Sequence, residues 1–229
     1  ITDYCDRSRL RMDERLMLFQ TACAALQHAH NKGIIHRDIK PSNVLVTEHD
    51  GTPAVKVIDF GIAKTRTHIL TDKTLYTGVF QMIGTPLYMS PEQASLSNLD
   101  VDTRSDVYSL GVMLYELIAG TLPFDRSKIN SMSMEQARQY IQDTEPRRPS
   151  KRVSVAAEYV ETLAENRSIS VSQLQKAVHG ELDWIAMRAI EKDRQRRYQS
   201  PRELSEDIAR YLSGETVDAC PPSWSYVAN

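Results

Sequence analysis

The chain has 229 residues, of which 41% are hydrophobic, and a formal net charge of −2 at pH 7. This apolar content is enough for one sizeable core, and the near-neutral charge argues against a nucleic-acid partner, which needs a strongly basic surface. No apolar run reaches the length of a membrane span, and the first residues do not form a secretory leader. We therefore expect a cytoplasmic protein without a membrane segment in this chain, with a tether elsewhere in the parent protein left open.

The first long helix is predicted over residues 13–32. Asp13 is the candidate N-cap and Gly33 the stop signal. His28 and His30 have no metal-binding spacing and are expected to be ordinary helix-face residues. Residues on one face recur at steps of three and four: Leu16, Phe19, Cys23, Leu26 and His30.

Three short strands are predicted next, over residues 34–35, 44–46 and 55–58. The last two form a ribbon closed by the polar turn at 49–53. Asp38 lies in the loop before the ribbon, and Asp59 directly follows its second strand. We therefore expect both carboxylates at one edge of the ribbon, held by short rigid elements.

The stretch from residue 59 to 92 is rich in Thr and Gly and has no sustained period, which is typical of a functional loop. A helix that is apolar on all sides, and therefore buried, is predicted over residues 106–117, with Gly120 beyond its end.

Further helices are predicted in the last hundred residues, at 132–142, weakly at 154–169, at 181–192 and from Ser200 to about residue 212. A basic loop broken by prolines separates the first two, at 146–152. Gly214 ends the last helix. The remainder, 213–229, is predicted to be a linker or tail.

Three short motifs occur in a fixed order along the chain. His36-Arg37-Asp38 is followed by Asn43 at the spacing H-R-D-x-x-x-x-N, then by Asp59-Phe60-Gly61 and by Ser90-Pro91-Glu92. This ordered set resembles the catalytic loop, the metal-binding turn and the end of the activation segment of a protein kinase. The resemblance covers residues 1–212 and is strongest to the eukaryotic-like serine/threonine kinases of bacteria. It implies an α+β protein-kinase-like fold, here mainly the helical C-terminal lobe with short β-ribbons.

The resemblance also implies roles for individual residues. Asp38 would be the base that receives the substrate hydroxyl proton, and Lys40 would reach the transferred phosphate. Asn43 and Asp59 would bind Mg²⁺, and together with Lys40 and Leu45 they would bind ATP. A lysine at position 40 is the serine/threonine form of the motif, so the expected partners are protein substrates with Ser or Thr, and ATP.

The same resemblance predicts contacts between distant parts of the chain. Asp106 would hold the backbone of the catalytic loop, and Arg197 would form a buried ion pair with Glu92. Thr85 would hydrogen-bond to Asp38 and Lys40. A phosphothreonine between residues 65 and 85 would pair with Arg37. Within that window the candidates are Thr65, Thr67, Thr71, Thr74 and Thr77, of which Thr74 and Thr77 are favoured.

Other interpretations stay open. Asp, Asn and Gly are common in turns, so the motifs could be structural only, and small-molecule kinases use a similar Asp and Asn pair. The 229 residues include neither a G-x-G-x-x-G loop nor a V-A-I-K lysine strand, the parts of the upper lobe that hold ATP. We therefore expect residues 1–212 to be a truncated catalytic domain that is inactive by itself, or else a non-catalytic, pseudokinase-like docking or scaffold fragment.

Overall fold

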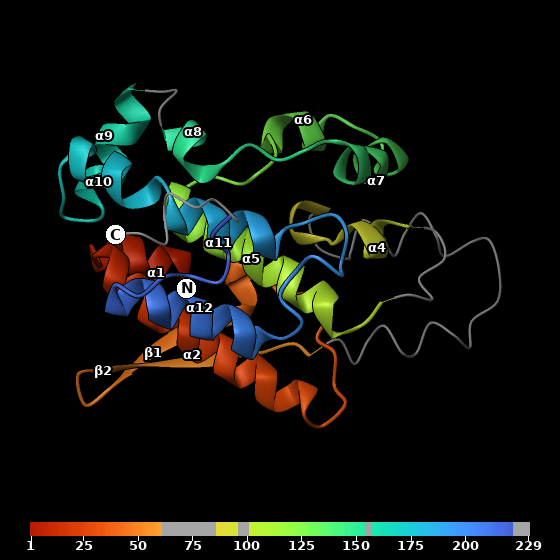
Figure 1. Cartoon of the computed structure of the whole chain (residues 1–229), viewed down its shortest axis with the longest axis horizontal. Helices are drawn as coiled ribbons and strands as arrows, with labels where there is room; N and C mark the ends of the chain where they lie inside the picture. The colour runs from red at the N-terminus through yellow and green to blue at the C-terminus, as the bar shows by residue number, and fades with distance from the viewer. Residues whose placement is uncertain (61–85, 96–100, 154–156, 222–229) are drawn as a thin grey trace.

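The computed structural model describes residues 1–60, 86–95, 101–153 and 157–221, which form helices packed around one central helix, with a single ribbon at the side (Figure 1). Among these residues, no helix is both long and apolar enough to cross a membrane. The elements, in chain order, are α1 (Thr2–Arg7), α2 (Met12–His30), the 3-10 helix η1 (Pro41–Asn43), β1 (Val44–His49), β2 (Thr52–Val57), the 3-10 helix η3 (Pro86–Tyr88), α4 (Pro91–Ala94), α5 (Thr103–Ala119), α6 (Arg126–Asn130), α7 (Met134–Asp143), α8 (Pro149–Val153), α9 (Ala157–Glu165), α10 (Val171–Val178), α11 (Glu181–Ala189) and α12 (Pro201–Ser213).

Helix α5 forms the centre of the core, as its all-round apolar sequence predicts. It contacts α2, α8, α11 and α12, and nearly all of its residues are buried. The Asp102 side chain caps its N-terminus, and Gly120 ends it in the left-handed conformation. A Cβ atom at Gly111 would lie 2.6 Å from the Cβ of Ala189. The close approach of α5 and α11 therefore depends on a glycine at this position.

Helix α2 confirms the first predicted helix but not its predicted cap. The N-cap is Arg11, whose backbone N–H donates to the Glu14 carboxylate at 2.7 Å, so Asp13 lies inside the helix. A glutamate three residues beyond the cap accepts the N–H of the cap residue itself, whereas a capping aspartate would accept an N–H from the first turn of the helix. Gly33, at φ +73°, ends the helix as predicted, and the Ile34 N–H returns to the Ala29 carbonyl at 3.0 Å.

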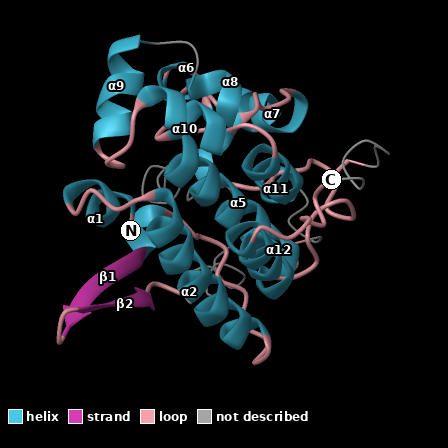
Figure 2. Ribbon diagram, turned by 60° about the vertical axis from the view of Figure 1, so that its left-hand side comes forward, coloured by secondary structure: helices cyan, strands magenta, loops and turns pink. Residues whose placement is uncertain are grey.

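The ribbon is antiparallel and longer than predicted. Val44 pairs with Val57 at one end and His49 with Thr52 at the other. The turn consists of Asp50 and Gly51, both at positive φ, which matches the right-handed twist of the two strands. The ribbon extends beside α2 (Figure 2). The short strand predicted at 34–35 is wrong, because the described residues form one sheet of two strands, β1 and β2.

The second half of the chain has more helix than predicted. The predicted loop at 146–152 contains α8, because the buried Asp183 carboxylate accepts the Ser150 backbone N–H at 2.8 Å and the Ser150 hydroxyl at 2.5 Å. Helix α10, which the Ser170 side chain caps, was not predicted from the sequence. Helix α12 is confirmed, with Ser200 as its cap and Gly214 as its end.

A buried arginine joins the helix ends in this region. Arg167 follows α9 and is 1% exposed. Its guanidinium donates to the carbonyls of Leu117 at 2.6 Å and Ile118 at 3.3 Å, at the end of α5, and to that of Leu163 in α9 at 3.0 Å. Burial lowers the pKa of Arg167 to about 10, so it stays protonated at neutral pH. The positive charge therefore lies where two helix dipoles end.

Candidate active site

The loop that carries Asp38 is fixed by a buried carboxylate from the central helix. Asp106 of α5 accepts the backbone N–H groups of His36 at 2.8 Å and Arg37 at 2.7 Å, which confirms the predicted contact. The Nε2 atom of His30 lies 2.7 Å from the same carboxylate, and both side chains are buried. His30 lies on helix α2 as predicted, but its contact with Asp106 is a role that the sequence did not predict. Its partner is 76 positions away, beyond the reach of a local spacing rule.

Three of the predicted catalytic side chains contact one another. Lys40 Nζ donates to Asp38 Oδ2 at 2.9 Å. Asn43 Nδ2 donates to the Asp38 backbone carbonyl at 2.8 Å and lies 3.4 Å from Asp38 Oδ2. Asn43 is 5% exposed, whereas a third of the Asp38 side chain is exposed. The loop therefore holds Asp38 in one orientation and leaves part of its carboxylate open to a substrate. Because the Asn43 NH₂ group faces Asp38, its Oδ1 atom is available as a metal ligand.

The ring of His36 connects this loop to the segment that carries Asp59. Its Nε2 atom donates to the Ile58 carbonyl at 2.8 Å, and its Nδ1 atom accepts the Asp38 N–H at 3.3 Å, so the hydrogen bonds assign a neutral ring with its proton on Nε2. The ring also packs against Phe60, with 4.8 Å between ring centroids. Asp59, the residue after Ile58, therefore lies beside the loop of Asp38. His36 belongs to the H-R-D motif, but the sequence did not predict this role for it.

Two residues of the site have strained backbones. Arg37 lies at φ +66° and Asp59 at φ +59°. Residues other than glycine rarely adopt this conformation, which costs about 1–3 kcal/mol and persists only when neighbouring contacts impose it. The Asp106 carboxylate supplies such a contact for Arg37. Strain at both positions is typical of a preorganised functional site.

The segment that includes Ser90-Pro91-Glu92 is bound to the same loop. Gln93 Nε2 donates to the Arg37 carbonyl at 2.8 Å. The Ser90 hydroxyl caps α4, and the Ser109 hydroxyl of α5 donates to the Tyr88 carbonyl at 2.8 Å. Helix α4 is therefore hydrogen-bonded to Arg37, the residue directly before Asp38.

Glu92 and Arg197 form the predicted ion pair. The two carboxylate oxygens accept from Arg197 Nη1 at 2.7 Å and Nη2 at 2.8 Å, and the Ser105 hydroxyl donates to Glu92 at 2.7 Å. The Arg197 side chain is 0% exposed and that of Glu92 is 11% exposed. Burial by itself would raise the pKa of Glu92, but the hydrogen bonds and charge of Arg197, together with Ser105, hold it below its usual value. The pair is therefore buried and bidentate, as predicted.

The remaining predicted residues differ in how far the structure describes them. Leu45, on β1 just after Asn43, is 42% exposed, and Asp59 is exposed. Gly61, Thr85 and the candidate phosphorylation sites Thr65, Thr67, Thr71, Thr74 and Thr77 lie outside the described residues.

The residues predicted to bind metal supply hard oxygen ligands. The described part of the chain has no group of three or more His, Cys, Asp or Glu side chains that could hold a metal ion. Asn43 and Asp59 together offer one amide oxygen and one carboxylate. Mg²⁺ is commonly bound by one or two such protein ligands, with phosphate and water completing its coordination. The donor set therefore fits Mg²⁺ that arrives with a nucleotide.

The sequence is similar to that of characterised kinases. A family profile described as "Protein kinase domain" matches residues 2–206. Serine/threonine-protein kinase PknB of Mycobacterium leprae is 38% identical over 198 residues, which are 86% of this chain and 26% of that protein. Serine/threonine-protein kinase pkn3 of Myxococcus xanthus is 37% identical over 212 residues, which are 88% of this chain and 38% of that protein. The chain thus spans well under half the length of either relative.

The fold is also similar to that of a solved structure. The kinase domain of PknI from Mycobacterium tuberculosis matches with a TM-score of 0.54 and 24% sequence identity, over 88% of this chain and 56% of that chain. At this identity the likeness concerns the fold.

Proposed function

Because the chain belongs to the protein kinase domain family, we propose that it carries the phosphoryl-transfer site of a serine/threonine kinase, which moves the γ-phosphate of ATP to Ser or Thr side chains of protein substrates. The observation that carries the proposal is the hydrogen-bonded set of Asp38, Lys40 and Asn43. A solvated turn would not need a buried asparagine and a buried aspartate, Asp106, to fix its backbone.

Asp38 is the base of the proposed reaction. Its partly exposed carboxylate would accept the proton of the substrate hydroxyl as the oxygen attacks phosphorus. Asn43 fixes the carboxylate through the Asp38 backbone, which reduces the freedom lost when substrate binds. The Lys40 ammonium group, 2.9 Å from Asp38, would offset negative charge on the transferred phosphate.

Asn43 and Asp59 would hold the metal and thereby the nucleotide. Bound Mg²⁺ would neutralise charge on the phosphate oxygens. The exposed Leu45 side chain gives an apolar surface next to Asn43 on which the base of ATP could lie. Selection of Ser and Thr over Tyr is proposed from Lys40, by resemblance to the family motif.

The proposal is tested with the chain joined to an upper lobe that carries a Gly-rich loop and a lysine strand, from its parent protein or a bacterial relative. Incorporation of labelled phosphate into a generic protein substrate should be lost in Asp38→Ala and retained in Asp143→Ala, which removes an exposed carboxylate from α7. Equal incorporation by the wild type and Asp38→Ala would reject the assignment. No incorporation by a folded wild type would favour the non-catalytic, docking interpretation.

A further inference from the structure

Residues 215–221, here called the C-terminal strap, pack on the end of the domain. After Gly214 the Glu215 N–H donates to the Arg210 carbonyl at 2.9 Å, and the Cys220 N–H closes a turn onto the Val217 carbonyl at 3.1 Å. Val217 is 1% exposed and belongs to the hydrophobic core. The domain end predicted at residue 212 stays a prediction, but the strap within the predicted tail is bound to the helices.

A buried carboxylate on α12 holds the strap. Asp207 is 0% exposed and accepts the backbone N–H groups of Asp218 at 2.5 Å and Ala219 at 3.0 Å. It also accepts the Tyr198 hydroxyl at 2.5 Å. Burial, followed by the charge of Asp207, raises the pKa of Tyr198, so this hydroxyl remains a donor. The charge of Asp207 is also balanced by Arg210, whose Nη1 atom lies 3.5 Å from Asp207 Oδ1. One carboxylate therefore connects the strap to Tyr198, and each lost hydrogen-bond donor would leave a buried oxygen less well satisfied.

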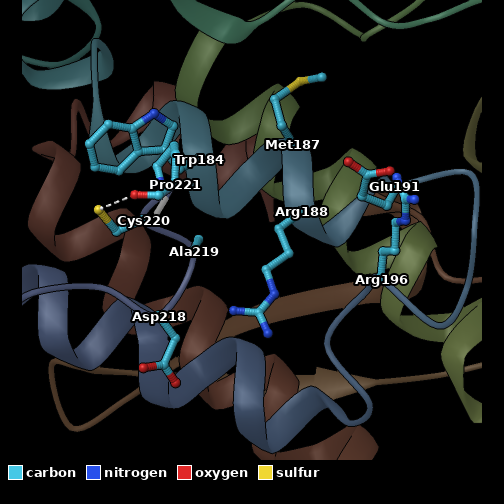
Figure 3. A pocket seen from close by; sticks show the side chains of 9 residues that line it. All are labelled: Trp184, Met187, Arg188, Glu191, Arg196, Asp218, Ala219, Cys220 and Pro221. Carbon is cyan, nitrogen blue, oxygen red and sulfur yellow. Dashed lines mark hydrogen bonds between the residues drawn. The ribbon is translucent and has the colours of Figure 1, made fainter. Parts of the chain in front are cut away.

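Tyr198 is also held from the side of α11. The guanidinium of Arg188 lies 4.5 Å from the centroid of its ring, within reach of a cation–π interaction. Figure 3 shows Arg188 of α11 and Asp218 of the strap lining the same pocket. The position of the Tyr198 ring is thus set by α11, α12 and the strap together.

The residue next to Tyr198 is Arg197, which binds Glu92. Glu92 is followed by Gln93, whose side chain donates to the Arg37 carbonyl next to Asp38. Each step from the strap to the catalytic loop is a hydrogen bond or a single peptide unit, and the side chains of Asp207, Tyr198 and Arg197 are all nearly or fully buried. Such a contiguous packed route can carry a displacement from one end to the other, and a measured coupling between its ends is the test of it.

We propose that the strap is a positioning element for the segment at Ser90-Pro91-Glu92, with Asp207 and Tyr198 as positioning residues that act through Arg197. Loss of the strap would leave the Asp207 carboxylate short of two donors, and the Tyr198–Arg197 segment would adjust to supply others. Glu92, and with it α4, would then lose its fixed partner. The coupling of the strap to α4 does not depend on the proposed function. Its effect on substrate binding rests on that function.

Hydrogen exchange of the 229-residue chain tests the coupling without any need for activity. Tyr198→Phe removes one hydroxyl and keeps the ring. We expect exchange of the Ala94 and Ser95 amides, which bond to the carbonyls of Ser90 and Pro91, to rise about tenfold, while amides in the middle of α2 change less than about twofold. Unchanged exchange in α4, or a uniform rise throughout the chain, would overturn the proposal.

A matched pair of valine variants tests the strap itself. Val217→Ala loosens the strap, and Val178→Ala makes the same deletion at an equally buried site on α10. Only Val217→Ala should raise exchange in α4. Equal effects of the two variants would mean that the strap acts through general stability and not through Asp207, which would also overturn the proposal.

An activity measurement extends the test to the form joined to an upper lobe. Tyr198→Phe should raise the KM for a peptide substrate several-fold and leave the KM for ATP unchanged, because the resemblance to kinases implies that the segment ending at Glu92 receives the peptide substrate. An equal rise in both constants would argue against a positioning role. If that protein proved inactive, the proposed function would fail, and the exchange measurements would still decide whether the strap and α4 are coupled.

Discussion

The ion pair between Glu92 and Arg197 allows a quantitative prediction, because both side chains are nearly or fully buried and each makes further hydrogen bonds within the domain. Among the residues that the structure describes, Arg197→Ala would leave the Glu92 carboxylate with the Ser105 hydroxyl as its one hydrogen-bonded side-chain partner. It would also remove the guanidinium donors to the carbonyls of Arg104, Glu191 and Lys192. Removal of one partner from a buried pair costs about 3–5 kcal/mol. At roughly 2–4 °C per kcal/mol for a chain of this size, the melting temperature should fall by about 6–20 °C.

The matched control is an arginine whose ion pair is exposed. Arg202 and Glu206 lie on successive turns of α12, 2.7 Å apart, with side chains 75% and 48% exposed. Arg202→Ala should cost no more than about 0.5 kcal/mol, because solvent screens such pairs. Both variants are compared with the wild type by thermal and urea unfolding of the same chain. If Arg197→Ala and Arg202→Ala unfold at the same temperature, the assignment of a buried, stabilising pair is wrong.

The pH dependence gives a second check on the same pair. The folded-state pKa of Glu92 is lowered from its usual value of 4.5, so its contribution to stability is fully present above pH 4.5 and is lost as the pH falls through the folded-state pKa. In Arg197→Ala burial raises the pKa of Glu92, so this carboxyl takes up its proton at a higher pH than in the wild type. The difference in unfolding free energy between the wild type and Arg197→Ala should therefore be largest near neutral pH and shrink as the pH falls through both pKa values. A difference that does not change down to the acid transition would contradict this account.

Four further outcomes are expected. In the form joined to an upper lobe, Asp59→Ala should abolish phosphate transfer while the protein stays folded, because the side chain is exposed and outside the core; a folded, active variant would exclude a metal-binding role. Asp106→Ala leaves two buried backbone donors and His30 without their acceptor, so urea unfolding should show a loss of about 3–5 kcal/mol, and a loss under 1 kcal/mol would contradict the network. Mass spectrometry of active enzyme should find phosphate within residues 65–85, and undiminished activity with phosphate only elsewhere would count against this. Calorimetry of the 229-residue chain with Mg²⁺ and ATP should show no micromolar binding, because no Gly-rich loop or lysine strand is present to hold the phosphates.

The sequence predicted the fold and the motif residues because these depend on local patterns. The protein-kinase-like α+β fold is confirmed by the family match and by the likeness to a solved kinase domain. Buried helix α5 and the cap of α12 at Ser200 follow from hydrophobic periodicity and capping chemistry, which act over a few residues. The pair of Glu92 and Arg197 was found only through family resemblance, since nothing local relates two residues 105 positions apart.

Most of what the sequence did not predict depends on tertiary contacts. The role of His30 requires Asp106 from another helix. Helix α8 forms where a basic loop broken by prolines was expected, because the Asp183 carboxylate of α11 accepts hydrogen bonds from Ser150. The N-cap at Arg11 was missed for a local reason: its side chain makes no capping hydrogen bond, and the start of the helix is marked by Glu14, which accepts the Arg11 N–H. For His30 and Ser150, by contrast, the partner comes from a distant part of the chain.

Arg167 has a consequence for any attempt to shorten or recombine this lobe. The sequence predicts α9 only weakly, so this region would be a natural choice for deletion or for exchange with a relative. Arg167, just after the end of α9, however, donates hydrogen bonds to the carbonyls of Leu117 and Ile118 at the end of α5, the central helix of the core. A loop that replaced residues 157–167 without an equivalent donor would leave those carbonyls buried and unpaired. The boundary of a transferable unit therefore lies beyond this arginine, and grafts should carry α9 and Arg167 together with α5.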